Sequence, residues 1–73
     1  MDQKQETQIK NNFIERLRSI RTGKGQSQET LAHQCELDRT YIGGVEQGER
    51  NISLLNIYRI AIALVISPRE LLK

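Results

Sequence analysis

Apolar residues recur every three or four positions along most of the chain, which is the spacing of one face of an α-helix. The first series predicts a helix that ends at Gly23 and Gly25, and its members are Ile9, Phe13, Leu17 and Ile20. Residues 1–8 carry no such pattern. We therefore expect a flexible lead-in over residues 1–8, frayed or loosely helical, followed by a single domain over residues 9–73.

Polar capping residues divide the rest of the chain into four further helices. Ser27, Asp38 and Ser53 each suit the N-cap position, where a side-chain oxygen accepts from free amides of the first turn. Pro68 suits the first position of a last short helix. The predicted helices span residues 28–35, 39 to about 47, 54 to about 64 and 68–72. Five helices without a strand pattern predict an all-α domain.

The second and third predicted helices are separated by only about three residues, as in a helix-turn-helix unit. Apolar residues suited to two steeply crossing helices are Leu31, Cys35, Leu37, Ile42 and Val45. Ala32 is small where the third helix must approach the second. A generic helical hairpin would need neither the small residue nor the tight turn, so the pattern favours a helix-turn-helix.

The exposed face of the third helix carries side chains that can contact base edges in a major groove. The candidates are Arg39, Thr40, Tyr41, Gly43 and Gln47. Arginine can donate two hydrogen bonds to guanine, threonine can contact a thymine methyl group, and glutamine can pair with adenine. Gly43 and Gly44 each cost a helix about 1 kcal/mol relative to alanine. Close approach to DNA and close helix packing are both adequate explanations for the two glycines.

A second group of polar residues could contact the sugar-phosphate backbone. Its members are Arg21, Ser27, Gln28, Arg50, Asn51 and Ser53. Gln28 begins a helix whose free amides favour an anion, although it could also be an ordinary exposed residue. Ser53 could equally serve only as a cap. The net charge of +2 is weak support, and the basic cluster of Arg16, Arg18, Arg21 and Lys24 could be a solvated helix face.

The fourth predicted helix offers more apolar surface than one side can bury. Its core face comprises Ile57, Ile60, Ala61 and Leu64. Apolar residues off that face are Leu55, Tyr58, Ile62 and Val65, which together with Leu71 and Leu72 could form a two-fold interface. Spare apolar surface predicts a partner, and a homodimer would also stabilise so small a domain. Two recognition helices would then lie about 34–36 Å apart on a pseudo-palindromic site.

Other classes of protein find little support in the sequence. A single cysteine, Cys35, excludes an intrachain disulfide and is expected to be a small core residue. His33 is expected to be exposed. Metal-ligand spacing and a phosphate-binding glycine loop are absent, so we expect no enzyme, cofactor, metal or small-molecule substrate. The apolar stretches are too short for a membrane span and the N-terminus resembles no secretory signal, which predicts a cytoplasmic protein.

The run LDRTYIGGVEQGERNIS, with QSQETLA before it and IYRIAIAL after it, resembles the controller proteins of bacterial restriction-modification systems. These controllers belong to the lambda-repressor-like helix-turn-helix family. The similarity extends over residues 13–72 and is most specific at residues 38–42 and 49–51. It implies a five-helix lambda-repressor-like domain that binds DNA as a dimer.

The resemblance also implies a regulatory role and assigns individual residues to it. Controllers of this kind bind paired sites upstream of their own and the endonuclease genes, activating at low concentration and repressing at high concentration. Such a protein delays the endonuclease until the methyltransferase has acted, and activation adds RNA polymerase to the candidate partners. Base contacts are implied for Arg39 and Thr40, with Tyr41 near the operator centre. The implied backbone contacts are Gln28, Arg50 and Asn51.

Two residues depart from the family pattern. Glu36 stands where a turn glycine is frequent, and Val65 stands where glycine often ends the fourth helix. In a left-handed conformation each would carry strain of about 1–3 kcal/mol. Alternatives to a controller are a phage-type or antitoxin-type repressor and a protein-docking module that does not bind DNA. Binding to DNA that weakens steeply with salt would distinguish a DNA-binding protein from a docking module.

Overall fold

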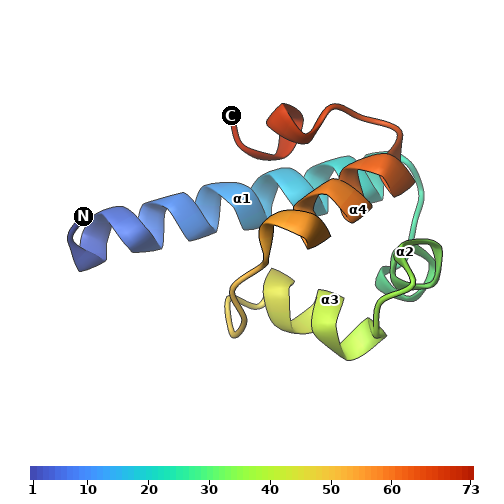
Figure 1. Ribbon diagram of the computed structural model, residues 1–73, viewed down its shortest axis with the longest axis horizontal. Coiled ribbons are helices and arrows are strands. Elements are labelled where there is room, and N and C mark those ends of the chain that lie inside the picture. The colour runs from blue at the N-terminus through green and yellow to red at the C-terminus, as the bar shows by residue number, and fades with distance from the viewer.

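The computed structural model describes residues 1–73, the whole of the chain, as an all-helical bundle. The elements are α1 (Gln3–Gly23), α2 (Gln28–Cys35), α3 (Arg39–Glu46), α4 (Leu54–Leu64) and the 3₁₀-helix η1 (Pro68–Leu71). The domain therefore has four α-helices rather than the five that the sequence predicts, because the last segment makes only a 3₁₀ turn. Figure 1 shows α1 along the long axis of the molecule, with the C-terminal segment folded back beside it.

Helix α1 begins earlier than its apolar pattern. Asp2 and Gln5 form a capping box, in which the Gln5 amide donates to Asp2 Oδ1 (2.8 Å) and the Asp2 amide donates to Gln5 Oε1 (3.0 Å). The start predicted at Ile9 is wrong, because residues 3–8, predicted as a frayed or loosely helical lead-in, belong to the regular helix α1. Ile9 is itself 57% exposed, so the first turns of α1 extend beyond the hydrophobic core (Figure 1).

The core lies where α2 packs against α3 and α4, and where α3 and η1 pack against α1. Its fully buried large side chains are Leu17, Leu31, Ile42, Ile60, Leu64 and Leu71. The predicted core positions of α2, α3 and α4 are confirmed, including Cys35 and Val45, whereas Ile57 is only half-buried. None of the helices combines the length and apolar character that crossing a membrane requires.

Leu71 lies in the core and not on an interface, which corrects the sequence-based prediction. The chain turns back at η1 onto α1, where Arg16 Nε donates to the Glu70 carbonyl at 2.8 Å and the Asn12 amide donates to the Lys73 carbonyl. These bonds hold the last turn against the bundle and leave Leu71 with no exposed surface. Leu72, its neighbour, is 58% exposed.

Glu36 and Val65, the two departures from the family pattern, both adopt the left-handed conformation. They follow α2 and α4 with φ angles of 58° and 57°. The next amides close these helices, since Leu37 N donates to Ala32 O (2.9 Å) and Ile66 N donates to Ala61 O (3.0 Å). The backbone of each turn is thus well hydrogen-bonded around a residue that carries a side chain where glycine is favoured.

Candidate nucleic-acid interface

Helix α3 buries one face and presents the other to solvent. Ile42 and Val45 are 0% and 2% exposed, whereas Arg39 and Thr40 at the start of the helix are exposed. Among the other predicted base contacts, Gln47 is exposed and Tyr41 and Gly43 are half-buried. Asp38 occupies the predicted N-cap position, but its carboxylate makes no capping hydrogen bond. The amino end of α3 is therefore free of protein partners on its outer side.

The start of α2 lies beside the start of α3. Ser27 caps α2 as predicted, since its Oγ accepts from Thr30 N at 3.0 Å. A wholly polar pocket of about 410 Å³ joins the two helix starts, and it is lined by Arg21, Ser27, Gln28, Glu29 and Arg39. The pocket thus brings the first turn of α2, including the acidic Glu29, beside Arg39 of α3, and a helix N-terminus next to a cation is suited to a phosphate group.

Arg21 lines this pocket but is not available as a backbone contact, contrary to the prediction. It is only 8% exposed. Its Nε and Nη2 donate to Glu46 Oε2 (2.7 Å) and Oε1 (2.9 Å), and its Nη1 donates to the Gln26 carbonyl (2.7 Å). The hydrogen bond to Glu46 also raises the pKa of Arg21. The guanidinium is thereby committed to joining α1 and α3.

Glu46, whose role the sequence analysis missed, is the centre of this polar network. Its side chain is fully buried and accepts from Arg21 and from Gln28 Nε2 (3.0 Å), while Arg18 Nη2 donates to its carbonyl (2.8 Å). Burial acts to raise the pKa of Glu46, but hydrogen bonds from Arg21 and Gln28 and the nearby arginine charges outweigh it, so the pKa is lowered. The available clue was its position four residues after Ile42, on the buried side of α3.

The network changes the interpretation of two predicted features. One Gln28 amide hydrogen is held by Glu46, which orients this half-buried side chain at the start of α2. In the basic cluster of α1, Arg16 pairs with Glu70 (3.4 Å), and Arg18 and Arg21 pair with Glu46. A phosphate-binding role for the cluster is therefore not supported, because most of its charge is paired within the protein.

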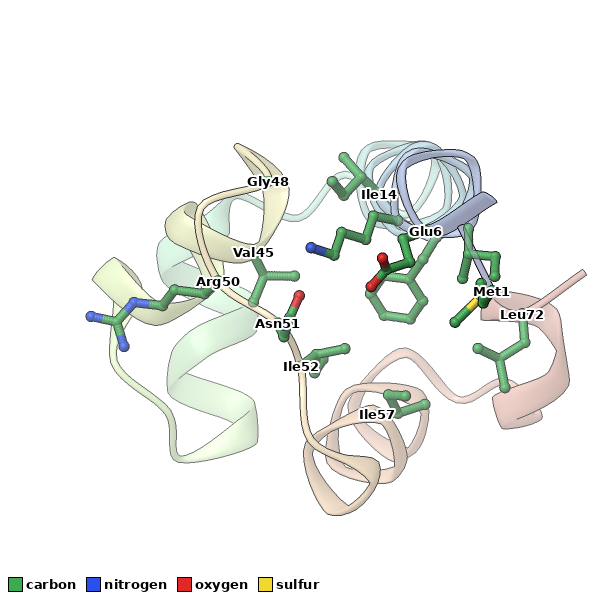
Figure 2. A pocket seen from close by; sticks show the side chains of 13 residues that line it. Met1, Glu6, Ile14, Val45, Gly48, Arg50, Asn51, Ile52, Ile57 and Leu72 are labelled. Carbon is green, nitrogen blue, oxygen red and sulfur yellow. The ribbon is translucent and has the colours of Figure 1, made fainter. Parts of the chain in front are cut away.

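Arg50 and Asn51 lie in the exposed loop between α3 and α4. The Arg50 guanidinium carbon is 5.9 Å from the centre of the Tyr41 ring, within reach of a cation–π interaction. Figure 2 shows the Arg50 side chain extending away from the apolar residues Ile52 and Ile57, which help line a pocket of about 310 Å³ beside α1. Ser53, also exposed, accepts from Asn56 N at 3.2 Å and so caps α4 as predicted.

The outer face of α4 is apolar, as the sequence predicts. The exposed residues of that prediction are Leu55 (65%), Tyr58 (50%), Ile62 (73%) and Val65 (84%). Leu72, also exposed, lines the pocket beside α1 together with Met1 and Ile9, and Leu71 is buried. The result is an unpartnered apolar face on the opposite side of α4 from Ile60 and Leu64.

Cys35 and His33, the remaining side chains considered for chemistry, lie where the sequence predicts them. Cys35 is a small core residue as predicted: it is buried, its thiol lies 3.8 Å from the Arg59 carbonyl, and burial raises its pKa. His33 is exposed, also as predicted. No group of three or more His, Cys, Asp or Glu side chains is placed to hold a metal ion.

The buried two-helix frame and the free amino end of α3 define a helix-turn-helix protein, and residues 17–71 match the profile of the helix-turn-helix family. The chain belongs to this family, which is not a class of enzymes. Control protein C.BamHI of Bacillus amyloliquefaciens is 49% identical over 61 residues, covering 82% of this chain and 75% of that protein.

Solved structures agree with this assignment. The restriction-modification controller protein C.AhdI from Aeromonas hydrophila has a TM-score of 0.82 and 60% identity, covering 85% of this chain and 94% of the other. The controller C.Esp1396I, as a tetramer in complex with its natural 35-base-pair operator, has a TM-score of 0.77 and 33% identity, covering 89% and 96%. The predicted resemblance to restriction-modification controllers is confirmed.

Proposed function

We propose that this chain is a dimeric, sequence-specific DNA-binding regulator of transcription, the controller of a restriction-modification system. The observation that carries the proposal is the exposure of Arg39 and Thr40 at the amino end of α3, while Ile42 and Val45 of the same helix are buried. A helix held in this way can enter a major groove with its first residues against base edges. The similarity to controllers, one of them bound to its operator, supports the assignment.

Sequence discrimination is assigned to the outer face of α3. Arg39 can donate two hydrogen bonds to guanine O6 and N7, and Gln47 can pair with adenine. Thr40 and Tyr41 offer contacts to a thymine methyl group or to sugar, and Gly43 lets the backbone approach the base pairs closely. Each good pairing with a base contributes about 1–3 kcal/mol to discrimination.

We assign the positioning of the protein along the duplex to contacts with the sugar-phosphate backbone of the DNA. Ser27 and Gln28 line the polar pocket at the start of α2, where first-turn amides and the Gln28 side chain, oriented by Glu46, would hold one phosphate. The loop after α3 offers further phosphate contacts, from Arg50, Asn51 and Ser53. Arg21 is not among these contacts, because it is buried and each of its three guanidinium nitrogens already donates to Glu46 or Gln26.

The apolar outer face of α4 is the proposed dimer interface. Leu55, Tyr58, Ile62 and Val65 would pack against the same residues of a second copy, whereas Leu71, which the sequence analysis had also assigned there, is buried and takes no part. A two-fold axis there would present two α3 helices to successive major grooves, about 34–36 Å apart. The operator would accordingly be pseudo-palindromic.

Within the cell the protein would act in the cytoplasm on its own promoter and on that of the endonuclease. Activation at low concentration and repression at high concentration would delay the endonuclease, and activation would bring RNA polymerase into contact with the bound dimer. A phage-type or antitoxin-type repressor of the same fold would repress only. Transcription assays in vitro over a range of protein concentrations distinguish these alternatives, because only a controller activates before it represses.

The direct test is binding of the purified protein to DNA from upstream of its own gene and to a scrambled duplex of the same composition. We expect a footprint with two-fold symmetry on the upstream DNA and an affinity that falls steeply as salt rises, by counterion release. Equal affinity for the two duplexes, or affinity independent of salt, would exclude sequence-specific binding and favour a protein-docking module.

A further inference from the structure

Gly44 is an unfavourable residue for the middle of a helix, and Arg50 provides a physical reason for it. Gly44 follows Thr40 by four residues and so lies on the same side of α3, yet it is buried while Thr40 is exposed. The three atoms nearest to the position of an added Cβ at Gly44 all belong to the Arg50 side chain. Gly44 is therefore covered by an arginine that comes from the following loop.

A side chain at position 44 would have to displace Arg50. An added Cβ would lie 3.0 Å from Arg50 Cδ, 3.1 Å from Cγ and 3.3 Å from Nε. These are consecutive atoms, so the aliphatic part of Arg50 lies flat across the helix. At Gly43 an added Cβ would meet only Gln28 Oε1, at an ordinary 3.4 Å. The two adjacent glycines therefore differ, and only Gly44 is explained by packing.

Further contacts hold Arg50 in this position. The amides of Glu49 and Arg50 both donate to the Gly44 carbonyl, at 2.8 and 3.2 Å, which fixes the loop over the end of α3. One turn before Gly44, the Tyr41 ring lies 5.9 Å from the guanidinium carbon. Gly44 and Tyr41 thus both contact Arg50. The aliphatic part of its side chain packs against Gly44, and its guanidinium lies over the Tyr41 ring.

We propose that Gly44 is a positioning residue, which holds the Arg50 guanidinium beside the DNA-contacting face of α3 before DNA binds. The inference rests on the proposed function, because it takes Arg50 as a phosphate contact. A long side chain that is ordered in advance avoids a loss of entropy on binding, which corresponds to about two- to tenfold in affinity per arginine. An alanine at position 44 would displace the stem of Arg50 and remove this advantage.

Order of the Arg50 side chain in the free protein is the first test and requires no DNA. Nitrogen-15 relaxation at arginine Nε reports motion on the picosecond to nanosecond timescale. We expect Arg50 to be more ordered than Arg69, whose side chain is 82% exposed, and Gly44→Ala to make the two equally mobile. An Arg50 as mobile as Arg69 in the wild-type protein would overturn the proposal.

A double-mutant cycle on a mixed-sequence duplex is the second test, since a phosphate contact does not depend on base sequence. We expect Arg50→Ala to weaken binding about tenfold or more, and Gly44→Ala to weaken it about two- to tenfold. Gly44→Ala should have no further effect in the Arg50→Ala background. The matched control is Gly23→Ala, at a helical glycine with no atom within 4 Å of an added Cβ, which should leave binding unchanged.

The outcomes separate this inference from the proposed function. The midpoint temperature of thermal unfolding should be no lower for Gly44→Ala than for the wild type. Alanine favours the helix, and the atoms nearest to its Cβ belong to the exposed Arg50 side chain, which can move. Wild-type affinity for Gly44→Ala, or an equal loss with and without Arg50, overturns the positioning role while DNA binding stands. A wild-type protein that binds no DNA removes the proposed function, and the relaxation measurement still decides whether Gly44 orders Arg50.

Discussion

Replacing Arg21 by methionine removes the main partner of a buried carboxylate. Glu46 has no exposed side-chain surface and Arg21 has 10%, so the two form a buried ion pair with two short hydrogen bonds. Loss of one partner of a buried pair costs about 3–5 kcal/mol, since the remaining charge is left without compensation. Gln28 and Arg18 still contact Glu46, which places Arg21→Met at about 3 kcal/mol, the lower end of that range.

Urea unfolding followed by far-ultraviolet circular dichroism measures this loss, at a fixed protein concentration because self-association would add to apparent stability. The matched control is Glu70→Gln, which removes the charge paired with Arg16 and leaves the bond from Arg16 Nε to the Glu70 carbonyl in place; both side chains of this pair are about one-third exposed. That partly exposed pair should contribute less than about 1 kcal/mol. Equal losses for the two variants would refute the claim that burial makes the Arg21–Glu46 pair important.

The pKa of Glu46 gives the same pair a pH dependence. Because the folded protein holds this pKa below its ordinary value, the carboxylate contributes stability above the ordinary glutamate range and loses it as pH falls through the folded pKa. Stability of the wild type should therefore decline on acidification more than that of Glu46→Gln, which has no carboxylate to protonate. Parallel pH profiles for the two proteins would contradict the lowered pKa.

Four substitutions test the turn, the interface and the division of labour in DNA binding. Glu36→Gly should raise the free energy of unfolding by about 1 kcal/mol, because it relieves the backbone strain of a residue with a side chain in the left-handed conformation. Thermal unfolding measures the change, and an unchanged midpoint would mean that the turn is unstrained. Ile62→Asp should give a monomer with weak DNA binding, and a variant that still sediments as a dimer would exclude the α4 interface. Arg39→Ala should abolish sequence discrimination, whereas Arg50→Ala should weaken specific and random DNA alike; equal, small effects in binding titrations would refute the separation.

The amino-acid sequence by itself was enough to locate α2, α3 and α4 and the solvent-exposed start of α3. Those features depend on local interactions and periodicity, such as the hydroxyl caps at Ser27 and Ser53 and the apolar spacing that buries Ile42. The resemblance to controllers was visible for the same reason, because the helix-turn-helix frame is almost contiguous in the chain.

Only the tertiary structure decided which charged and apolar side chains are used inside the domain. Arg21 is committed to Glu46, 25 residues away, and Leu71 is buried because η1 folds back onto α1. Gly44 is explained by Arg50, which reaches it from the following loop. Such pairings join residues on different elements, so periodicity along one helix carries no information about them, and a buried charge becomes recognisable only when its partner is in place.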